Sequence, residues 1–484
     1  MIRIAAIGLL LSALSFAENS PVLELDDCRI RISPGSPGIA ARCGIFTRPL
    51  DPMNEQAGTI DLKVAGIPAL SLEPATDPFV PIAGGPGQST IQFYAGWTSA
   101  FERVRKDRDI LLLDQRGTGQ STPMTCELDE DAIDGKYSAE QTLRLTHECI
   151  DLLPHDPRFF TTSVAVQDLE ALRVALGYAR LNLYGISYGT RVAQHFARRY
   201  PDSTRTVILD GVVPPHLPLG PEIATESQLA IDRVFDRCAR EPACGEQFPD
   251  IRSDFASLRA TLSAAPVTVQ LMHPVTAKQE PVEFGEQQLA AAVRLLLYNP
   301  RTVALLPLVI HEAANGNYTP LAAQFHMIIT SLAESLNIGM HNAVLCTEDA
   351  PFIDWDNLDH DSIRASYMGP LQLDAIKTMC SVWPAGVLDE DMREPLATDL
   401  PVLLLSGGAD PITPSRYADM AAVEMSSAWL LTGENQGHGL AAIGCMPRIV
   451  GEFVKTAALP DDAATCLSNA FVMPFFVDYS GPAP

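Results

Sequence analysis

Three residues far apart in the sequence have the side chains that nucleophilic hydrolysis needs: Ser187, Asp410 and His438. In such a set, the imidazole takes the proton from the serine hydroxyl and later gives it to the leaving group. The carboxylate holds the imidazole in the required tautomer and stabilises its charged form. The side chains of a serine hydrolase are therefore present, and the surrounding sequence indicates whether the fold brings them together.

Ser187 lies in the segment Gly185-Ile186-Ser187-Tyr188-Gly189, between an apolar run and a helical pattern. In a G-x-S-x-G turn the serine occupies a strained backbone conformation that only small flanking residues permit, and its hydroxyl is lifted clear of the sheet. A predicted helix at 163–175 precedes this segment, and a predicted buried strand at 206–211 follows it. This context predicts that Ser187 is the nucleophile.

Asp410 and His438 each follow a short apolar run, at 400–406 and 428–432, which we interpret as strands. Functional residues of parallel sheets gather beyond the carboxyl ends of the strands, so we expect these two side chains to meet Ser187 there. Asp210 also ends a predicted strand, and it is the alternative acid of the triad.

A glycine-rich loop, Gly84-Gly85-Pro86-Gly87, directly follows another predicted strand at 78–83. Backbone NH groups of such a loop approach a reacting oxygen closely. We expect the NH groups of Gly85 and Tyr188 to hold the oxyanion, whereas Pro86 has no NH to donate. A nucleotide phosphate loop is disfavoured because the Lys-Ser/Thr pair of a Walker motif is missing.

The strand predicted at 109–114 leads into the segment Asp114-Gln115-Arg116-Gly117. Asp114 and Arg116 are expected to pair with each other and to brace the loops over the nucleophile. Structural support is favoured over a direct catalytic role for both residues.

The alternation of predicted helices and strands around Ser187 is typical of a mostly parallel sheet with helices on both faces. The chain order serine, acid, histidine is that of the α/β-hydrolase fold. From about 214 to 396 helical segments dominate, and we expect them to form a large cap inserted over the site. The predicted organisation is a signal peptide at 1–17, a first core segment at 18–213, the helical cap at 214–396 and a second core segment at 397–484.

The chain has 484 residues and a formal net charge of -25 at pH 7. This acidity argues against nucleic acid and anionic membrane surfaces as partners. Residues 1–17 combine one basic residue, an apolar segment and small residues, which predicts a signal peptide cleaved near Ala17. No later stretch is long and apolar enough to suggest a membrane span. We therefore expect a secreted or periplasmic protein, with a monomer favoured.

The cysteines fall into neighbouring couples along the chain. An even number of cysteines in an exported protein favours disulfide bonds, although sequence alone fixes no connectivity. The pairs we expect are Cys28 with Cys43, Cys126 with Cys149, Cys238 with Cys244, Cys346 with Cys380, and Cys445 with Cys466. A zinc site is disfavoured because there is no C-x-x-C motif and the segment 311–315 lacks a second histidine. We expect no metal and no cofactor.

The chain resembles the proline iminopeptidase and tripeptidyl aminopeptidase group of α/β-hydrolases. The resemblance rests on Gly84-Gly85-Pro86-Gly87, Asp114-Gln115-Arg116-Gly117-Thr118-Gly119-Gln120-Ser121, Gly185-Ile186-Ser187-Tyr188-Gly189 and the ending with Asp410 and His438. It extends from about Cys43 to Cys466, and the secreted, long-capped, cysteine-containing form is similar to the tripeptidyl aminopeptidase branch. Ala83 stands where proline iminopeptidases often carry a histidine, which argues against that branch.

This resemblance implies a serine exopeptidase that releases tripeptides or single residues such as proline from the free N-terminus of short peptides, through an acyl-enzyme. A substrate ammonium group that leaves water must be paired, and Glu348 and Asp349 are the cap carboxylates expected to pair it. A solvated acidic loop is the alternative for these two residues. A carboxylesterase with the same triad and a non-catalytic binding module are the alternatives for the whole chain.

Overall fold

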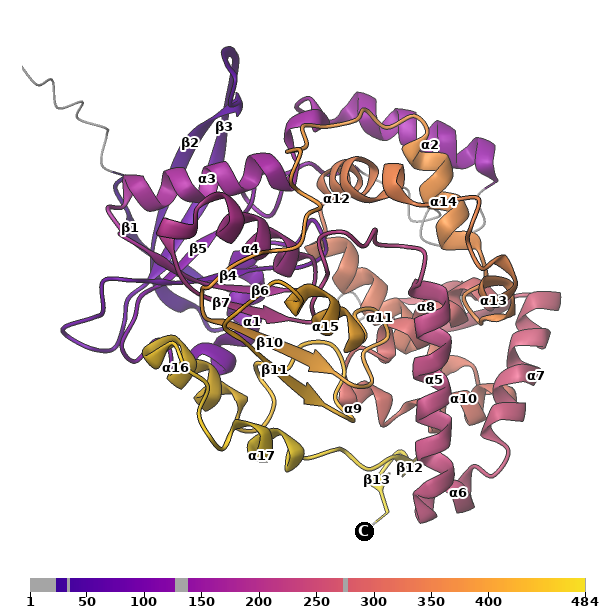
Figure 1. The fold of residues 1–484 in the computed structure, drawn as a ribbon. Helices are drawn as coiled ribbons and strands as arrows, with labels where there is room; N and C mark the ends of the chain where they lie inside the picture. Colours follow the sequence, from indigo (N-terminus) through magenta and orange to yellow (C-terminus); the bar gives the residue numbers. More distant parts are fainter. Residues whose placement is uncertain (1–22, 33–34, 127–137, 273–276, 484) are drawn as a thin grey trace, which may run out of the picture.

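A large, mostly parallel sheet forms the centre of the molecule (Figure 1). The computed structural model describes residues 23–32, 35–126, 138–272 and 277–483, so the predicted signal peptide lies outside the described residues. The strand order is β1-β2-β3-β5-β4-β6-β7-β10-β11. The strands are β1 (Asp26–Ile30), β2 (Ile39–Asp51), β3 (Asn54–Ile67), β4 (Phe79–Ile82), β5 (Ile110–Leu113), β6 (Leu181–Ile186), β7 (Thr204–Asp210), β10 (Val402–Gly407) and β11 (Ala428–Gly433).

Strands β4 to β11 of this sheet run parallel, while β1, β2 and β3 form an antiparallel lead-in. Successive side chains of a strand point to opposite faces. In β10, Val402 and Leu404 therefore join one hydrophobic core, and Leu403 and Leu405 join a second one on the other face. The first core includes α3 (Thr162–Ala175) and α4 (Tyr188–Arg199), and the second includes α1 (Thr90–Phe101) and α16 (Met446–Thr456). The predicted fold class is confirmed.

The segment between β7 and β10 is mostly helical and has a separate hydrophobic core; we call this segment the cap. Its helices are α5 (Ile223–Arg240), α6 (Pro242–Gln247), α7 (Ile251–Ala264), α8 (Glu286–Leu296), α9 (Pro300–Val303), α10 (Leu306–Ala314), α11 (Thr319–Ser335), α12 (Ile338–Val344), α13 (His360–Ala365) and α14 (Leu371–Cys380). A hairpin of β8 (Val267–Met272) and β9 (Gln279–Phe284) interrupts the helices. The predicted cap boundaries at 214 and 396 both fall in loops outside these elements.

All of the expected cysteine pairs are disulfide bonded, so the prediction is confirmed. Their Cα–Cα distances range from 4.9 to 6.1 Å. The bond between Cys346 and Cys380 joins α14 to a π-helical turn, η4 (Leu345–Asp349), which contains Glu348 and Asp349. The carboxylates that we expected to bind a substrate ammonium group therefore lie on a cross-linked part of the cap.

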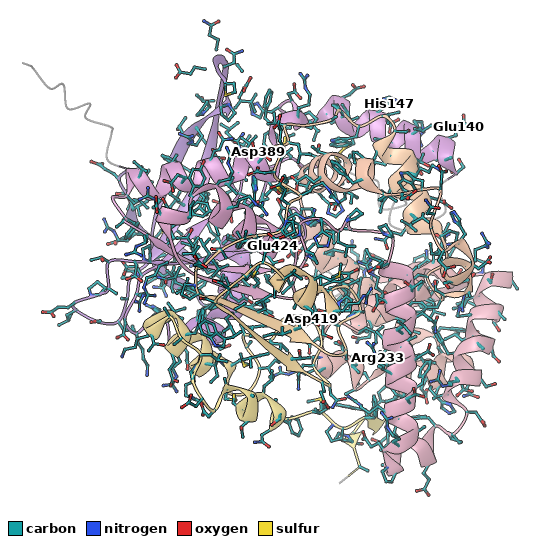
Figure 2. The ribbon with its side chains drawn as sticks, in the orientation of Figure 1. Glu140, His147, Arg233, Asp389, Asp419 and Glu424 are labelled. Atoms are coloured by element: carbon teal, nitrogen blue, oxygen red, sulfur yellow. A yellow bond between two sulfur atoms is a disulfide. The ribbon has the colours of Figure 1, made fainter. Side chains whose placement is uncertain are left out.

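The negative charge of the chain is spread over its surface. Figure 2 shows Glu140 on α2 (Ala139–Leu152), Asp419 on α15 (Arg416–Ala422) and Glu424 just beyond it. All three are exposed. No helix in the described ranges has both the length and the apolar character that a membrane crossing requires.

Candidate active site

Ser187 occupies a strained turn between β6 and α4. Its backbone has a φ of 56° and a ψ of -126°, which a residue with a side chain rarely adopts. The flanking glycines are required by space, because a Cβ on Gly185 would lie 2.2 Å from the carbonyl oxygen of Gly189. A Cβ on Gly189 would lie 2.3 Å from the carbonyl oxygen of Ile82 in β4. The turn therefore holds Ser187 at the carboxyl edge of the sheet, as the motif predicts.

Asp410 and His438 lie together in the loops that follow β10 and β11. The distance from His438 Nδ1 to Asp410 Oδ2 is 2.7 Å. The two loops pack backbone against backbone, because a Cβ on Gly407 would lie 1.9 Å from the carbonyl oxygen of Gly437. This arrangement leaves the other imidazole nitrogen, Nε2, for proton transfer with a nucleophile.

Asp210 ties the loop of His438 to the loop of Ser187. Its carbonyl oxygen accepts a hydrogen bond from the NH of Ser187 at 2.9 Å. Its carboxylate accepts hydrogen bonds from the NH groups of Leu440 and Ala441 and from the hydroxyl of Tyr184. The carboxylate of Asp210 is thus engaged with the backbone behind His438, and it is Asp410 that contacts the imidazole.

Thr413 positions the carboxylate of Asp410, and the sequence reasoning missed it. Its hydroxyl donates to Asp410 Oδ2 at 2.6 Å, and its NH donates to Asp410 Oδ1 at 3.0 Å. The NH of Ile412 donates to Oδ1 as well. An aspartate that accepts bonds from the backbone two and three residues later is a common turn, so a threonine at this spacing was a usable signal.

The pKa values of the two partners move in opposite directions. Burial alone would raise the pKa of Asp410, but the charge and hydrogen bond of His438 and the bonds from Thr413 lower it below its ordinary value. Burial alone would lower the pKa of His438, but the charge and hydrogen bond of Asp410 outweigh burial and raise it. The pair therefore favours an ionised carboxylate and a basic imidazole, which is what general base catalysis requires.

Tyr298, directly after α8 and its C-cap, is a cap residue that holds the histidine loop. Its carbonyl oxygen accepts a hydrogen bond from the NH of His438 at 2.8 Å. Its ring meets the imidazole edge to face, with 5.1 Å between the ring centres. No local pattern in the sequence links Tyr298 to His438, so this contact was not predictable from the sequence.

The glycine-rich loop passes directly beside the nucleophile. A Cβ on Gly84 would lie 2.9 Å from the Cβ of Ser187, and Gly85 has a φ of 104°, which favours glycine. The cap fixes this loop, because the NH of Asn337 donates to the carbonyl oxygen of Gly87 and His341 Nδ1 lies 3.1 Å from that of Pro86. Tyr188, the other expected oxyanion donor, is the first residue of α4, where NH groups have no acceptor within the helix.

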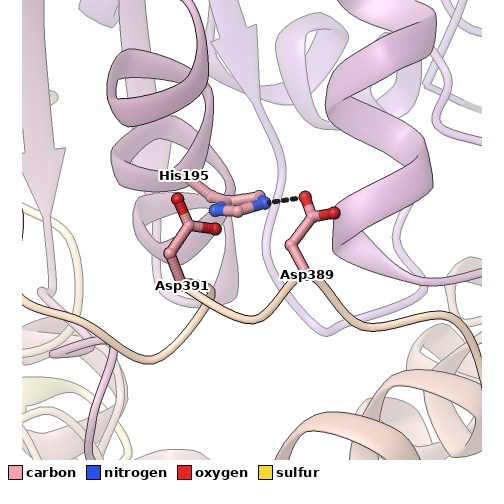
Figure 3. Close-up of side chains that lie close together, drawn as sticks. All are labelled: His195, Asp389 and Asp391. Atoms are coloured by element: carbon pink, nitrogen blue, oxygen red, sulfur yellow. Dashed lines mark hydrogen bonds and ion pairs between the residues drawn. The ribbon is translucent and has the colours of Figure 1, made fainter.

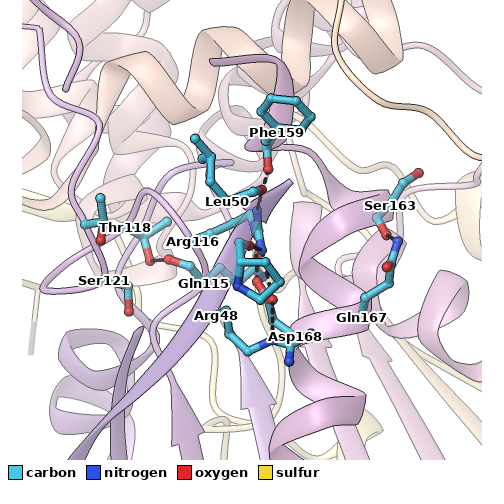
Figure 4. Close-up of polar contacts among 12 residues, drawn as sticks. Arg48, Leu50, Gln115, Arg116, Thr118, Ser121, Phe159, Ser163, Gln167 and Asp168 are labelled. Carbon is cyan, nitrogen blue, oxygen red and sulfur yellow. Dashed lines mark hydrogen bonds and ion pairs between the residues drawn. The ribbon is translucent and has the colours of Figure 1, made fainter. Parts of the chain in front are cut away.

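Asp114 and Arg116 do not pair with each other, so this prediction is wrong. Arg116 instead makes a two-pronged pair with Asp168 of α3, at 2.7 and 2.8 Å, and donates to the carbonyl oxygens of Leu50 and Phe159 (Figure 4). Asp114 accepts hydrogen bonds from the residues that begin α1. The planar guanidinium matches a carboxylate with two free oxygens, which Asp168 offers and Asp114 does not.

We expect Asp168→Ala to lower the free energy of unfolding by about 3–5 kcal/mol, because it leaves the buried charge of Arg116 without a partner. The side chains of Arg116 and Asp168 are only 0% and 2% exposed. Chemical unfolding followed by fluorescence measures the change. Glu148→Ala is the control, since it breaks an exposed pair with Arg144 and should shift the unfolding midpoint little. Equal midpoints for Asp168→Ala and the unmodified protein would contradict the assignment.

Glu348 and Asp349 are buried in the cap, so the alternative of a solvated acidic loop is wrong. Glu348 accepts hydrogen bonds from the NH and the hydroxyl of Thr162, at 2.7 and 2.9 Å. Asp349 Oδ1 lies 2.9 Å from Arg191 and accepts a bond from the NH of Leu219. Asp349 Oδ2 is buried and has no hydrogen-bond partner in the described part of the chain.

These two carboxyl groups are linked to the first turns of the nucleophile's helix. Arg191 lies one turn after Ser187 on α4, and the hydroxyl of Tyr188 lies 2.6 Å from that of Thr162, the partner of Glu348. Burial raises the pKa of Glu348 to about 7, and the charge of Arg191 only partly offsets this effect. Glu348 therefore changes its charge near neutral pH, close to the site.

A second cluster combines His195 of α4 with Asp389 and Asp391, which lie on the loop between α14 and β10 (Figure 3). His195 Nε2 is 2.8 Å from Asp389, and Arg198 lies 3.3 Å from the other ring nitrogen. Arg199 lies within 4 Å of both carboxylates. Two positive side chains thus balance the two carboxylates, and the cluster fastens the loop at 389–391 to α4.

Known proteins match this chain over most of its length. Residues 77–235 match the family model described as alpha/beta hydrolase fold, and residues 365–466 match the one described as TAP-like protein. A tripeptidyl aminopeptidase of Streptomyces lividans is 25% identical over 437 residues, which cover 81% of this chain and 77% of that protein. A serine protease of Mycobacterium tuberculosis is 26% identical over 416 residues, 79% of each chain. A solved proline iminopeptidase of Mycobacterium smegmatis aligns over 85% of this chain and 98% of its own, with 14% identity and a TM-score of 0.38.

The matched segments contain the residues that the sequence predicts for the triad and the oxyanion site. The first includes Gly85 and Ser187, and the second includes Asp410 and His438. The resemblance to the tripeptidyl aminopeptidase group that the motifs indicate is confirmed. The chain is a serine hydrolase of the α/β-hydrolase type, and over most of its length it is similar to tripeptidyl aminopeptidases.

Proposed function

We propose that this serine hydrolase is a secreted or periplasmic exopeptidase that acts on the free N-terminus of short peptides. It releases tripeptides or single residues such as proline. The observation that carries the proposal is the position of two buried carboxyl groups: Asp349 pairs with Arg191 of α4, and Glu348 accepts a hydrogen bond from Thr162 of α3. A substrate ammonium group provides the partner that Asp349 Oδ2 lacks. Disulfide bonds persist in oxidising compartments, which supports export.

The proposed reaction proceeds in two steps. His438 takes the proton of Ser187 as the oxygen attacks the scissile carbonyl, and then gives it to the amine that leaves, so that an acyl-enzyme forms. Water repeats the attack in the second step, and the proton returns to Ser187. The NH groups of Gly85 and Tyr188 hold the oxyanion in both steps, while Asp410 keeps the imidazole in the required tautomer.

The proposal is tested by comparing a tripeptide anilide that has a free amine with its N-acetylated twin and with a simple nitrophenyl ester. The exopeptidase proposal predicts a strong preference for the free amine. Fast cleavage of the ester with no turnover of either anilide would instead assign the protein to the carboxylesterases, which use the same triad.

We expect the preference for the free amine to increase as the pH rises from about 6 to 7.5. Glu348 has a pKa of about 7, so it is mostly neutral at the lower end of this range and mostly negative at the upper end, while more than half of the substrate amine stays protonated up to about pH 7.5. The ratio of kcat/KM for the free and acetylated substrates measures the effect, because protonation of His438 affects both substrates equally.

Glu348→Gln should make this ratio independent of pH, since the amide carries no charge. The exposed Glu140→Gln is the matched control and should keep the pH dependence. A flat ratio in the unmodified protein, or an unchanged slope in Glu348→Gln, would remove Glu348 from the ammonium site.

A further inference from the structure

His438 lines a cavity of about 540 Å³ that lies between the cap and the core. Three residues form apolar walls of the cavity: Trp97 of α1 and, near the C-terminus, Phe471 and Met473. Tyr298 forms the wall on the cap side. The volume is in the range of about 300–1,000 Å³ that is typical of small-ligand sites. The catalytic imidazole gives its proton to the leaving amine, so the part of the substrate that leaves must lie on the side of His438.

The charges around this cavity are unusual for such an acidic chain. Among the described residues, no acidic side chain lines this cavity, although the chain has a net charge of -25. Arg301, in α9, lines the cavity; this residue is exposed, and no salt bridge joins it to an acidic side chain in the described ranges. An exposed arginine attracts anions, and a cavity that no carboxylate lines does not repel them.

A second cation lies behind Tyr298. Arg294 of α8 donates to the hydroxyl of Tyr298 at 3.3 Å, and its buried Nε has no hydrogen-bond partner in the described part of the chain. Burial lowers the pKa of His341, and the charge of Arg294 acts in the same direction. Arg294 also opposes the rise in the pKa of His438. The positive charge of Arg294 therefore acts on both His341 and His438.

We propose that this cavity is the subsite for the leaving part of the substrate and that Arg301 selects a leaving part that carries a carboxylate. The inference rests on the proposed exopeptidase function and adds a substrate class to it. The carboxylate belongs either to the C-terminus of a short peptide or to an acidic side chain just after the scissile bond. A guanidinium binds a carboxylate through two parallel hydrogen bonds, which an amide of the same shape does not replace.

The test compares peptides with the same acyl part and different leaving parts. One pair ends in a free carboxylate or a carboxamide, and a second pair, amidated at its end, has Glu or Gln after the scissile bond. We expect kcat/KM to favour the carboxylate member by about 10- to 100-fold in one pair, and the favoured pair identifies the source of the carboxylate. Arg301→Met should reduce this ratio to near one, and Arg301→Lys should retain part of it.

Arg252→Met is the matched control, because it removes a cap arginine that is already paired with Asp232 and Asp236. It should keep the preference of the unmodified protein. Equal rates within both pairs, or a preference that survives in Arg301→Met, would overturn the assignment.

A tripeptide anilide has no carboxylate in its leaving group and reports the proposed function separately. If neither the anilide nor any peptide is cleaved, the exopeptidase proposal fails. The subsite is then tested by inhibition of nitrophenyl ester cleavage, using the free leaving amino acid and its amide. Stronger inhibition by the carboxylate form, lost in Arg301→Met, supports the subsite, and equal inhibition overturns it.

Discussion

Ser187→Ala should reduce kcat on any cleaved substrate by about 10⁶-fold, the largest effect that we expect from a single substitution. In the proposed site, the hydroxyl oxygen of Ser187 is the atom that forms a covalent bond to the substrate. Without it, the backbone donors and the substrate-binding groups provide only a small residual acceleration. Steady-state hydrolysis with a sensitive fluorogenic substrate measures the loss. Labelling by a fluorophosphonate probe should disappear in the same variant.

The losses of kcat caused by substitutions within the triad should not be additive. Combining Ser187→Ala with His438→Ala is expected to reduce kcat no further than either change alone, because the two side chains act as one unit. Ser381→Ala, at an exposed position in the cap, is the control and should keep both activity and labelling. Activity that survives in Ser187→Ala would mean that another residue is the nucleophile.

Asp410→Asn should reduce kcat by about 10⁴-fold while the protein stays folded. The amide has the shape of the carboxylate, but its NH₂ group donates a hydrogen bond where the carboxylate accepts one. His438 Nδ1 then has to act as the acceptor, so the imidazole adopts the wrong tautomer. The charge of Asp410 also helps to raise the pKa of His438. The residual activity of Asp410→Asn should therefore appear at a lower pH than that of the unmodified protein.

A pH profile of kcat/KM measures both parts of this prediction. Asp210→Asn provides the contrast, because Asp210 contacts the backbone behind His438 and not the imidazole. We expect it to lower stability more than it moves the pH profile. A 10⁴-fold loss in Asp210→Asn with full activity in Asp410→Asn would exchange the roles of the two acids.

The elements around the nucleophile were predictable because their signals are local. The turn at Ser187 needs its glycines within two residues, and the predicted helix at 163–175 coincides with α3. In the cap, where helical segments are expected throughout, α9 and α10 are two separate helices. Pro307 explains the break, since a proline has no NH for the preceding turn and is tolerated at the start of a helix.

The contacts that position the triad were not predictable in the same way. Asp114 is close to Arg116 in the sequence, yet the partner of Arg116 is Asp168 in another element, 52 residues away. Tyr298 contacts His438 only because the cap folds back over the sheet. Sequence patterns identify which residue types could meet, whereas the choice of partner depends on tertiary packing.

The burial of Glu348 and Asp349 gives a third example. Their sequence, beside a disulfide-bonded cysteine, is compatible with an exposed acidic turn as well as with a buried site. Only the packing of η4 against Thr162 and Arg191 buries them. That packing is what turns two acidic residues into a candidate site for a substrate ammonium group.

The central claim is that Ser187 removes residues from the free N-terminus of short peptides. Mass spectrometry of the products formed over time from one unmodified peptide tests it most directly, with the N-acetylated peptide and Ser187→Ala as controls. We expect fragments to appear in order from the N-terminus, and we expect no products from either control. Cuts within the peptide that occur equally well when the N-terminus is acetylated would contradict it.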